Sequence, residues 1–143
     1  MILFYFVLWT LLLYWVHRIV HNLPGIRKIH LHHHQFVLSN KTTWHWSNLF
    51  LFNDDWTSTF DLWITEVVPT ILFSLVTNQW WIFIFYYTWA AFIQESIEHN
   101  SNVNFFILTS GKWHLRHHHS PKNYGLFIPI WDIVFNTHEN VHE

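Results

Sequence analysis

Three histidines in the segment 113–132, WHLRHHHSPKNYGLFIPIWD, have the spacing of a metal-binding helix face. His114, His117 and His118 stand at positions i, i+3 and i+4. On an α-helix these side chains lie on one face, where their imidazoles can bind the same ion. A solvated histidine-rich turn or an expression tag is the alternative, but a tag would be an uninterrupted run at a chain end. We therefore expect half of a metal site here.

The same arrangement occurs earlier in the chain. HLHHH contains His30, His33 and His34, and HRIVH contains His17 and His21 at positions i and i+4. A first-row metal ion has room for about four to six ligands. Eight histidines in three clusters therefore predict two metal ions rather than one.

Composition points to a membrane protein of one domain, residues 1–143. The chain is 51% hydrophobic and 21% aromatic but only 11% charged, whereas about 25% of the residues of a soluble domain are charged. A net charge of -2 without a basic stripe argues against a nucleic-acid partner. The absence of cysteine excludes disulfides and thiolate-bound metals from this chain.

Residues 1–16 form an uninterrupted apolar run without charge. The basic start and small-residue cleavage site of a secretory signal are both absent. Because about 20 residues span a bilayer, we expect a membrane helix that continues through His17 and His21.

Two further apolar runs, 61–77 and 80–93, lie on either side of Asn78-Gln79 and predict a membrane-embedded helical hairpin. Pro69 is expected to kink its first helix because proline removes a backbone hydrogen bond. Glu66 in the same helix should face the protein interior or the metal side, or else reach water near the helix end.

Aromatic and polar residues alternate in the segment 35–60, which predicts an interfacial segment or a loop packed on the protein, followed by a turn at 53–55. The expected fold is all-α, with about three to four membrane-embedded helices. So few helices leave a homo-oligomer or a partner subunit open.

Charge distribution predicts the topology. All seven basic residues flank the histidine clusters, so the positive-inside rule places the clusters on the cytoplasmic face of a multi-pass protein. An even number of crossings also brings His99, which stands alone in ESIEHN, to that side. His99 is therefore the ninth candidate ligand.

The histidine clusters and the residues that follow the last one resemble the fatty acid hydroxylase and sterol desaturase superfamily, between Tyr14 and Thr137. The most specific part is WHLRHHHSPKNYGLFIPIWDIVFNT, in which HxxHH precedes Asn123-Tyr124-Gly125 and Trp131-Asp132. The resemblance implies a membrane enzyme with two iron ions that hydroxylates or desaturates a lipid, such as a fatty acyl chain or a sterol. It further implies an external electron donor of the ferredoxin, cytochrome b5 or reductase type.

The resemblance also implies which residues bind metal: His17, His21, His30, His33, His34, His99, His114, His117 and His118. Further ligands, or groups that orient the ligands, are expected among Glu66, Glu95, Glu98, Asp132, Asn123, His32 and His119. Asp132 has the alternatives of capping a helix or pairing with Arg116.

Two positions depart from the family pattern. Asn136 stands where relatives usually have glycine, and Glu95 stands four residues before His99, where some relatives have another histidine. Imidazole ligands alone do not identify the metal, and zinc is the alternative to iron in the purified protein. Iron is favoured because oxygen insertion into an unactivated C-H bond requires redox chemistry.

Other functions remain open. A carotenoid hydroxylase has comparable histidine clusters but lacks the Asn-Tyr-Gly and Trp-Asp signature. A non-catalytic membrane subunit would retain the histidines around a closed structural metal. Apolar helix centres argue against a metal or proton carrier. HExxH at 138–142 formally matches the zinc-protease pattern, but a third ligand downstream is not available before Glu143.

Overall fold

In the computed structural model, which describes residues 1–39, 43–53, 55–102 and 111–139, every regular element is helical. This confirms the all-α prediction for the described part of the chain. In order, the elements are α1 (Ile2–Val20), α2 (Pro24–Ser39), η1 (Trp46–Phe50), α3 (Trp56–Leu62), η2 (Trp63–Val67), α4 (Val68–Thr77), α5 (Trp80–Phe92), α6 (Gln94–Ile97), α7 (Lys112–His119) and α8 (Ile130–Val134).

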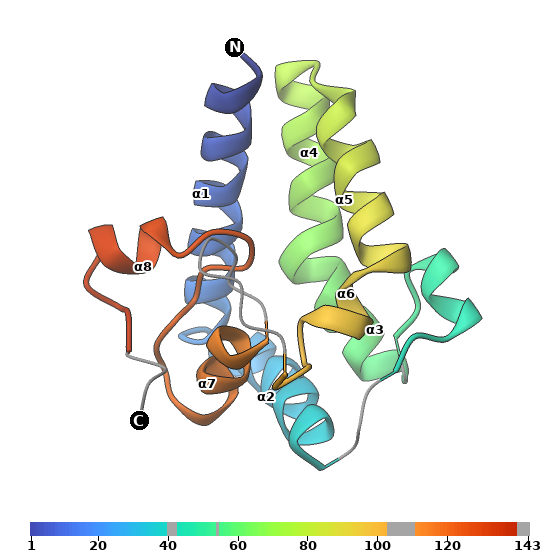
Figure 1. The fold of residues 1–143 in the computed structure, drawn as a ribbon, viewed down its shortest axis with the longest axis vertical. Helices are drawn as coiled ribbons and strands as arrows, with labels where there is room; N and C mark the ends of the chain where they lie inside the picture. Colours follow the sequence, from blue (N-terminus) through green and yellow to red (C-terminus); the bar gives the residue numbers. More distant parts are fainter. Residues whose placement is uncertain (40–42, 54, 103–110, 140–143) are drawn as a thin grey trace.

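The long apolar helices stand upright beside one another, and the histidine-bearing helices gather at one end (Figure 1). The N-terminus of α1 and the turn between α4 and α5 lie at the opposite end. Two described helices are long and apolar enough to cross a membrane, Ile2–Val20 and the continuous helix Trp56–Thr77. α5 runs antiparallel to α4 and completes the hairpin expected from the sequence.

The first hairpin helix starts at Trp56, not at Asp61 as the apolar pattern suggested. Asp55 caps it, because the Ser58 amide donates a 2.8 Å hydrogen bond to the Asp55 side chain. Trp63–Val67 forms a π-helical turn just before Pro69. Proline has no N-H to donate to the preceding turn, and its ring crowds a backbone carbonyl of that turn. The wider π-helical turn accommodates the Pro69 ring, which we expected to kink this helix.

Aromatic packing fills the space between α1 and the hairpin. The Trp9 ring lies 4.7 Å from the Phe127 ring, centroid to centroid, and its indole N-H donates to Thr70 at 2.9 Å. The C-terminal segment is tied to α1 by the hydroxyls of Tyr14 and Thr137, which lie 2.9 Å apart. These contacts hold α1 between the hairpin and the C-terminal segment.

The aromatic segment before the hairpin contains the short helix η1. Tyr87 and Trp63 hold it by donating to the backbone carbonyls of Leu49 and Leu51 at 2.8 and 3.1 Å. Phe50 remains 70% exposed, so its ring faces outward and does not join the core. The turn expected at 53–55 includes Asp54, which lies outside the described residues.

Candidate metal centre

Nine histidines from four separate segments meet at one end of the helices. Their ring nitrogens form two groups, and within each group the candidate ligand atoms lie within 4.8 Å of one another. The five-histidine group contains His17, His21, His30, His34 and His117, and the four-histidine group contains His33, His99, His114 and His118. The fold thus brings together all nine histidines singled out from the sequence, while their binding of metal remains a prediction.

In the five-histidine group the Nε2 atoms point at one another. His30 Nε2 lies 3.0 Å from the Nε2 atoms of both His17 and His34, and His21 Nε2 lies 3.1 Å from that of His117. Metal-imidazole bonds of 2.0–2.1 Å at right angles put two ligand nitrogens about 3.0 Å apart. The observed spacing therefore matches adjacent ligands of one ion.

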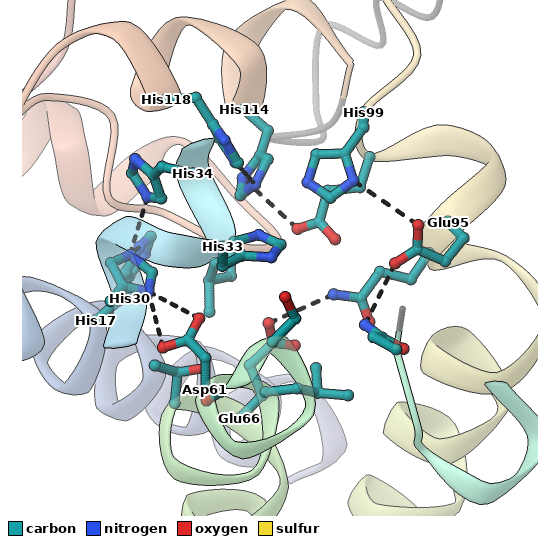
Figure 2. A pocket seen from close by; sticks show the side chains of 17 residues that line it. His17, His30, His33, His34, Asp61, Glu66, Glu95, His99, His114 and His118 are labelled. Atoms are coloured by element: carbon teal, nitrogen blue, oxygen red, sulfur yellow. Dashed lines mark hydrogen bonds and ion pairs between the residues drawn. The ribbon is translucent and has the colours of Figure 1, made fainter. Parts of the chain in front are cut away.

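The four-histidine group is built in the same way. His114 Nε2 and His118 Nε2 lie 2.9 Å apart, one helical turn from each other on α7. The ring centroids of His33 and His99 lie 5.4 Å apart, and each lies within 5.2 Å of the His118 ring. Figure 2 shows these rings facing a common cavity.

Backbone carbonyls determine which nitrogen of two candidate ligands carries the proton. His17 Nδ1 donates to the Tyr124 carbonyl at 2.8 Å, and His117 Nδ1 donates to the Lys122 carbonyl at 2.7 Å. Since a carbonyl only accepts, Nδ1 bears the hydrogen and each neutral ring keeps its Nε2 lone pair for a metal. Lys122 and Tyr124 both lie in the segment after α7, and Tyr124 is the tyrosine of the Asn-Tyr-Gly motif. This segment thus orients one imidazole of α1 and one of α7.

A carboxylate orients a third imidazole. His30 Nδ1 lies 2.9 and 3.0 Å from the two oxygens of Asp61, and both side chains are buried. The sequence reasoning missed Asp61 because it stands where the apolar run was taken to begin. The signal available was a second carboxylate in the same apolar helix, five residues before Glu66. Glu66 lies within the π-helical turn that follows Asp61, and both side chains line the cavity.

Two glutamates predicted beside the metals lie against the four-histidine group. Glu98 Oε1 is 3.5 Å from His114 Nδ1, and Glu95 Oε2 is 4.0 Å from His99 Nδ1. Asn53 donates to the other oxygen of Glu95 at 3.2 Å. Both glutamates therefore face the Nδ1 side of a ligand ring, the position from which a carboxylate orients a metal-bound imidazole.

Charge in the cavity favours two divalent cations. The cavity, of about 30 Å³, is lined by four buried carboxylates, those of Asp61, Glu66, Glu95 and Glu98. None of the described residues that line it is Lys or Arg. Buried carboxylates without a counterion take up protons, and burial raises the pKa of Glu98 well above its usual range. Two divalent ions bound by neutral imidazoles would favour the charged form of these carboxylates. The residues present therefore fit a dimetal centre.

Burial keeps the imidazoles in the form that binds metal. Loss of solvent contact lowers the pKa of His33 to about 4 and that of His21 to about 3. Burial together with neighbouring imidazoles holds the pKa values of His114, His117 and His118 well below the usual range. Near neutral pH these rings are uncharged, with a lone pair available.

Comparison with known proteins agrees with this geometry. A family model described as fatty acid hydroxylase matches residues 2–137. The chain belongs to the fatty acid hydroxylase family. No curated protein and no solved structure gives a significant match to it. Membership suggests a lipid hydroxylase or desaturase, in agreement with the resemblance seen in the histidine motifs.

Asp132 of the family signature supports the site from a distance and touches no ligand imidazole in the described structure. Its carboxylate accepts hydrogen bonds from the amides of Tyr124 and Gly125 at 2.8 and 2.9 Å and from the Thr137 hydroxyl at 2.8 Å. It therefore positions the loop whose carbonyl binds His17. The pairing with Arg116 considered from the sequence is wrong, because Arg116 pairs with Glu139.

Three other residues expected near the metals do not hydrogen-bond to the nine histidines. Asn123 binds the backbone of Glu139, accepting from its amide at 2.7 Å and donating to its carbonyl at 3.2 Å. His32 pairs with Asp55 at 2.9 Å near the surface, and His119 is exposed at the end of α7. His32 and His119 each adjoin a candidate ligand in sequence, but adjacent helical residues face different directions. Asn123 lies beyond the end of α7.

The family's usual glycine is replaced here without loss of the turn. Asn136 has a φ of 52°, in the left-handed region. Asparagine tolerates this region better than other non-glycine residues, so the backbone keeps the conformation that glycine would allow. The HExxH pattern at 138–142 extends into residues 140–143, which lie outside the described residues.

Proposed function

We propose that this protein is a membrane-bound di-iron oxygenase that hydroxylates or desaturates a lipid, using dioxygen and electrons from a donor protein. The convergence of nine imidazoles into two groups beside four buried carboxylates carries this proposal. Membership in the fatty acid hydroxylase family supports the class of reaction. Iron bound there would supply the redox chemistry that activates dioxygen toward an unactivated C-H bond.

The protein's own residues define the setting of that reaction. The five histidines and the four histidines would hold one ion each, and Asp61, Glu95 and Glu98 would orient three of the rings. Trp9 and Phe127 belong to the same buried apolar cluster as Leu126, which also lines the cavity, so apolar packing would exclude water from the side of the helices. A dry, preorganised site limits side reactions of activated oxygen.

The substrate would approach through the apolar part of the cavity wall. Leu62 and Leu126 are the apolar residues among the described lining, and both belong to the hydrophobic core between α1 and the hairpin. The other lining residues are polar or charged. An aliphatic carbon would be best accommodated on the leucine side, which supports a lipid chain entering from the helices rather than from water.

We further propose that residues 1–143 form one membrane-embedded domain with three crossings, α1 and the two arms of the hairpin. The exposed side chains of Ile2, Leu3, Leu72 and Val76 would then face lipid. The basic residues of the described part of the chain belong to the end of α1, to α2 and to the segment 112–122, which lie at the histidine end, and this supports a cytoplasmic site by the positive-inside rule.

Incubation of the iron-loaded protein in lipid nanodiscs tests the enzymatic function. Fatty acyl lipids, a sterol and a carotenoid would be supplied with dithionite or a ferredoxin system, and products analysed by mass spectrometry. Oxygen consumption coupled to a lipid product 16 mass units heavier, or 2 units lighter, is expected. A carotenoid product alone would favour the carotenoid hydroxylase alternative. Iron-dependent oxygen consumption without any oxidised lipid, or none at all, would contradict the proposal.

The small cavity gives one observation in favour of a non-catalytic subunit. A volume of about 30 Å³ lined by seven imidazoles leaves little space for dioxygen and a lipid carbon in this conformation. X-ray absorption spectroscopy of the metal-loaded protein distinguishes the two functions. Full coordination by nitrogen and oxygen that azide leaves unchanged would favour a structural metal pair, whereas azide binding shows an open position.

A further inference from the structure

A second cavity lies outside the metal centre, on the aromatic segment that precedes the hairpin. Its volume is about 650 Å³, and small-molecule pockets occupy roughly 300–1,000 Å³. Four large aromatic residues line it, together with four polar ones; the aromatic residues are Trp46, Phe50, Phe52 and Trp56. We call this cavity the aromatic pocket.

The rings of the aromatic pocket form two edge-to-face pairs. The ring centroids of Trp46 and Phe50 lie 6.0 Å apart with an angle of 87° between the ring planes, and those of Phe52 and Trp56 lie 5.0 Å apart at 86°. Trp56 is nevertheless 78% exposed, and Trp46 and Phe50 are exposed as well. Large aromatic side chains that gather around a cavity and stay open to solvent indicate a binding surface.

Hydrogen bonds fix the wall of the aromatic pocket to the rest of the protein. The buried side chain of Asn48, a polar lining residue, accepts from the His45 amide at 2.7 Å and donates to Asn53 at 2.9 Å. Asn53 in turn donates to Glu95 at 3.2 Å. Leu51, directly after η1, has a φ of 53°, a strained conformation that persists only where the surroundings hold it. The pocket is therefore preformed.

The chemistry of the lining favours a cation that has no hydrogen to donate. Ring faces of tryptophan and phenylalanine attract positive charge. None of the described lining residues is Lys, Arg, Asp or Glu, so the lining offers neither a charge for an isolated anion nor a carboxylate for a primary ammonium. A quaternary ammonium fits aromatic rings without hydrogen bonds. The hydroxyls of Thr43 and Ser47, also in the lining, can donate to a phosphate beside it.

The position of the aromatic pocket indicates where such a cation would come from. Trp56 is the first residue of the helix Trp56–Thr77, which is long and apolar enough to cross a membrane. η1 packs beside the last turns of α5, where the Trp44 indole donates to the Ala91 carbonyl at 2.8 Å (Figure 1). Both arms of the hairpin thus end near the pocket on the histidine side. If the hairpin crosses a bilayer, the pocket lies at the level of the headgroups.

We propose that the aromatic pocket binds the headgroup of a membrane lipid that carries a quaternary ammonium and a phosphate, as phosphatidylcholine does. This inference rests on the membrane placement proposed above and not on the metal chemistry. The bound headgroup would cover ring surface that is otherwise exposed to water, and it would hold this end of the hairpin at the membrane surface.

Native mass spectrometry of the full chain in an uncharged detergent tests the site. The protein is titrated with phosphatidylcholine, phosphatidylethanolamine and phosphatidylglycerol of identical acyl chains, and the fraction that retains one lipid is measured. Phosphatidylcholine is expected to bind about tenfold more tightly than the other two. Trp56→Leu should weaken its binding about fivefold, because leucine remains apolar but has no ring face, whereas Trp56→Phe should weaken it less.

Trp80→Leu is the matched control. Like Trp56, Trp80 is an exposed tryptophan at the start of an apolar helix, but it lies at the other end of the hairpin and does not line the pocket. This control should change phosphatidylcholine binding less than twofold. Equal effects of Trp56→Leu and Trp80→Leu, or equal binding of the three lipids, would overturn the site and leave only general contact of tryptophans with lipid.

Glycerophosphocholine, which has the same headgroup without acyl chains, separates a lipid from a soluble ligand. It is expected to displace phosphatidylcholine only at concentrations far above that of the lipid. Displacement at equal concentration would overturn the lipid source and assign the pocket to a soluble cation. Lipid retention requires no turnover, so a protein that retains phosphatidylcholine but oxidises no lipid would contradict the proposed function and still support this site.

Discussion

The carboxylate of Asp61 accepts a hydrogen bond from His30 Nδ1, at 2.9 Å from its nearer oxygen, while His30 Nε2 lies 3.0 Å from two other ligand nitrogens. One imidazole thus links a carboxylate of the first hairpin helix to the centre of the five-histidine group. A carboxylate in this position fixes the orientation of the ring, which would favour metal binding by its Nε2 atom.

Asp61→Asn should therefore weaken metal binding about 10- to 100-fold, because the amide oxygen is a poorer partner for the Nδ1 hydrogen. Competition with a chelator of known affinity measures the change. Asp55→Asn is the matched control: it alters the His32–Asp55 pair near the surface while asparagine can still cap α3. Equal metal affinity of Asp61→Asn and the control would contradict the role given to Asp61.

The unequal size of the two histidine groups predicts unequal tolerance to ligand loss. His21→Ala leaves four imidazoles in its group, whereas His118→Ala leaves three. After chelator treatment, His21→Ala should retain close to two metal ions per chain, and His118→Ala should fall toward one. Metal analysis by mass spectrometry measures the content. His119→Ala is the control, because this neighbour of His118 is exposed. Retention of two ions by His118→Ala would show that its group is not one metal site.

The helices and the histidine spacing could be predicted from the sequence because both depend on local periodicity. The hydrogen bonds that orient these histidines could not be predicted in this way. His30 and Asp61 are 31 residues apart, and His17 and Tyr124 are 107 apart. Their pairing depends on how α1, α2 and the hairpin pack. The sequence shows that Asp132 follows the last histidine cluster, so we expected it beside the metals. It does not show that the Asp132 carboxylate faces the amides of Tyr124 and Gly125.

Metal-free protein should lose stability as the pH falls below about 6.5. Burial lowers the pKa of His33 to about 4 in the folded state, while the unfolded chain has the ordinary value of about 6.5. Between these two values the unfolded state binds more protons, so the free energy of unfolding decreases as the pH falls through this window. Above about pH 7 the ring is neutral in both states and contributes no pH dependence.

Denaturant unfolding of the metal-free protein in detergent at pH 7.5, 6 and 5 measures this dependence. The raised pKa of Glu98 acts in the opposite direction, so His33 is isolated by comparison with His33→Gln, which cannot titrate. The variant should have a flatter slope of unfolding free energy against pH between 6.5 and 4. Parallel curves for the two proteins would show that His33 is not neutral in the folded state.

The left-handed conformation of Asn136 predicts a distinctive response to substitution. Asn136→Gly should leave stability within a few tenths of a kcal/mol, because glycine adopts a φ of 52° without strain. Asn136→Ala should cost about 1 kcal/mol, because a β-carbon without a compensating polar group is disfavoured in this region. Thermal unfolding in detergent compares the two. Equal stability of both variants would mean that the backbone relaxes out of the left-handed region.

Leu126 lies where the apolar wall of the cavity meets the core, which predicts an influence on the substrate. Leu126→Ala should enlarge the apolar side, shift the oxidised carbon or widen the range of chain lengths, and leave the metal content at two ions. Leu51→Ala is the matched control, because Leu51 is a buried core leucine that does not line the cavity.

Both substitutions should destabilise the fold by about 2–5 kcal/mol through the same kind of buried void. If the loss of stability by itself altered the product, the product would therefore change in both variants. Mass spectrometry of lipid products, with thermal unfolding measured in parallel, separates the two effects. An altered product distribution in Leu126→Ala alone places the substrate chain against this leucine. An unchanged distribution in an active Leu126→Ala enzyme would mean that the lipid reaches the metals from another side of the cavity.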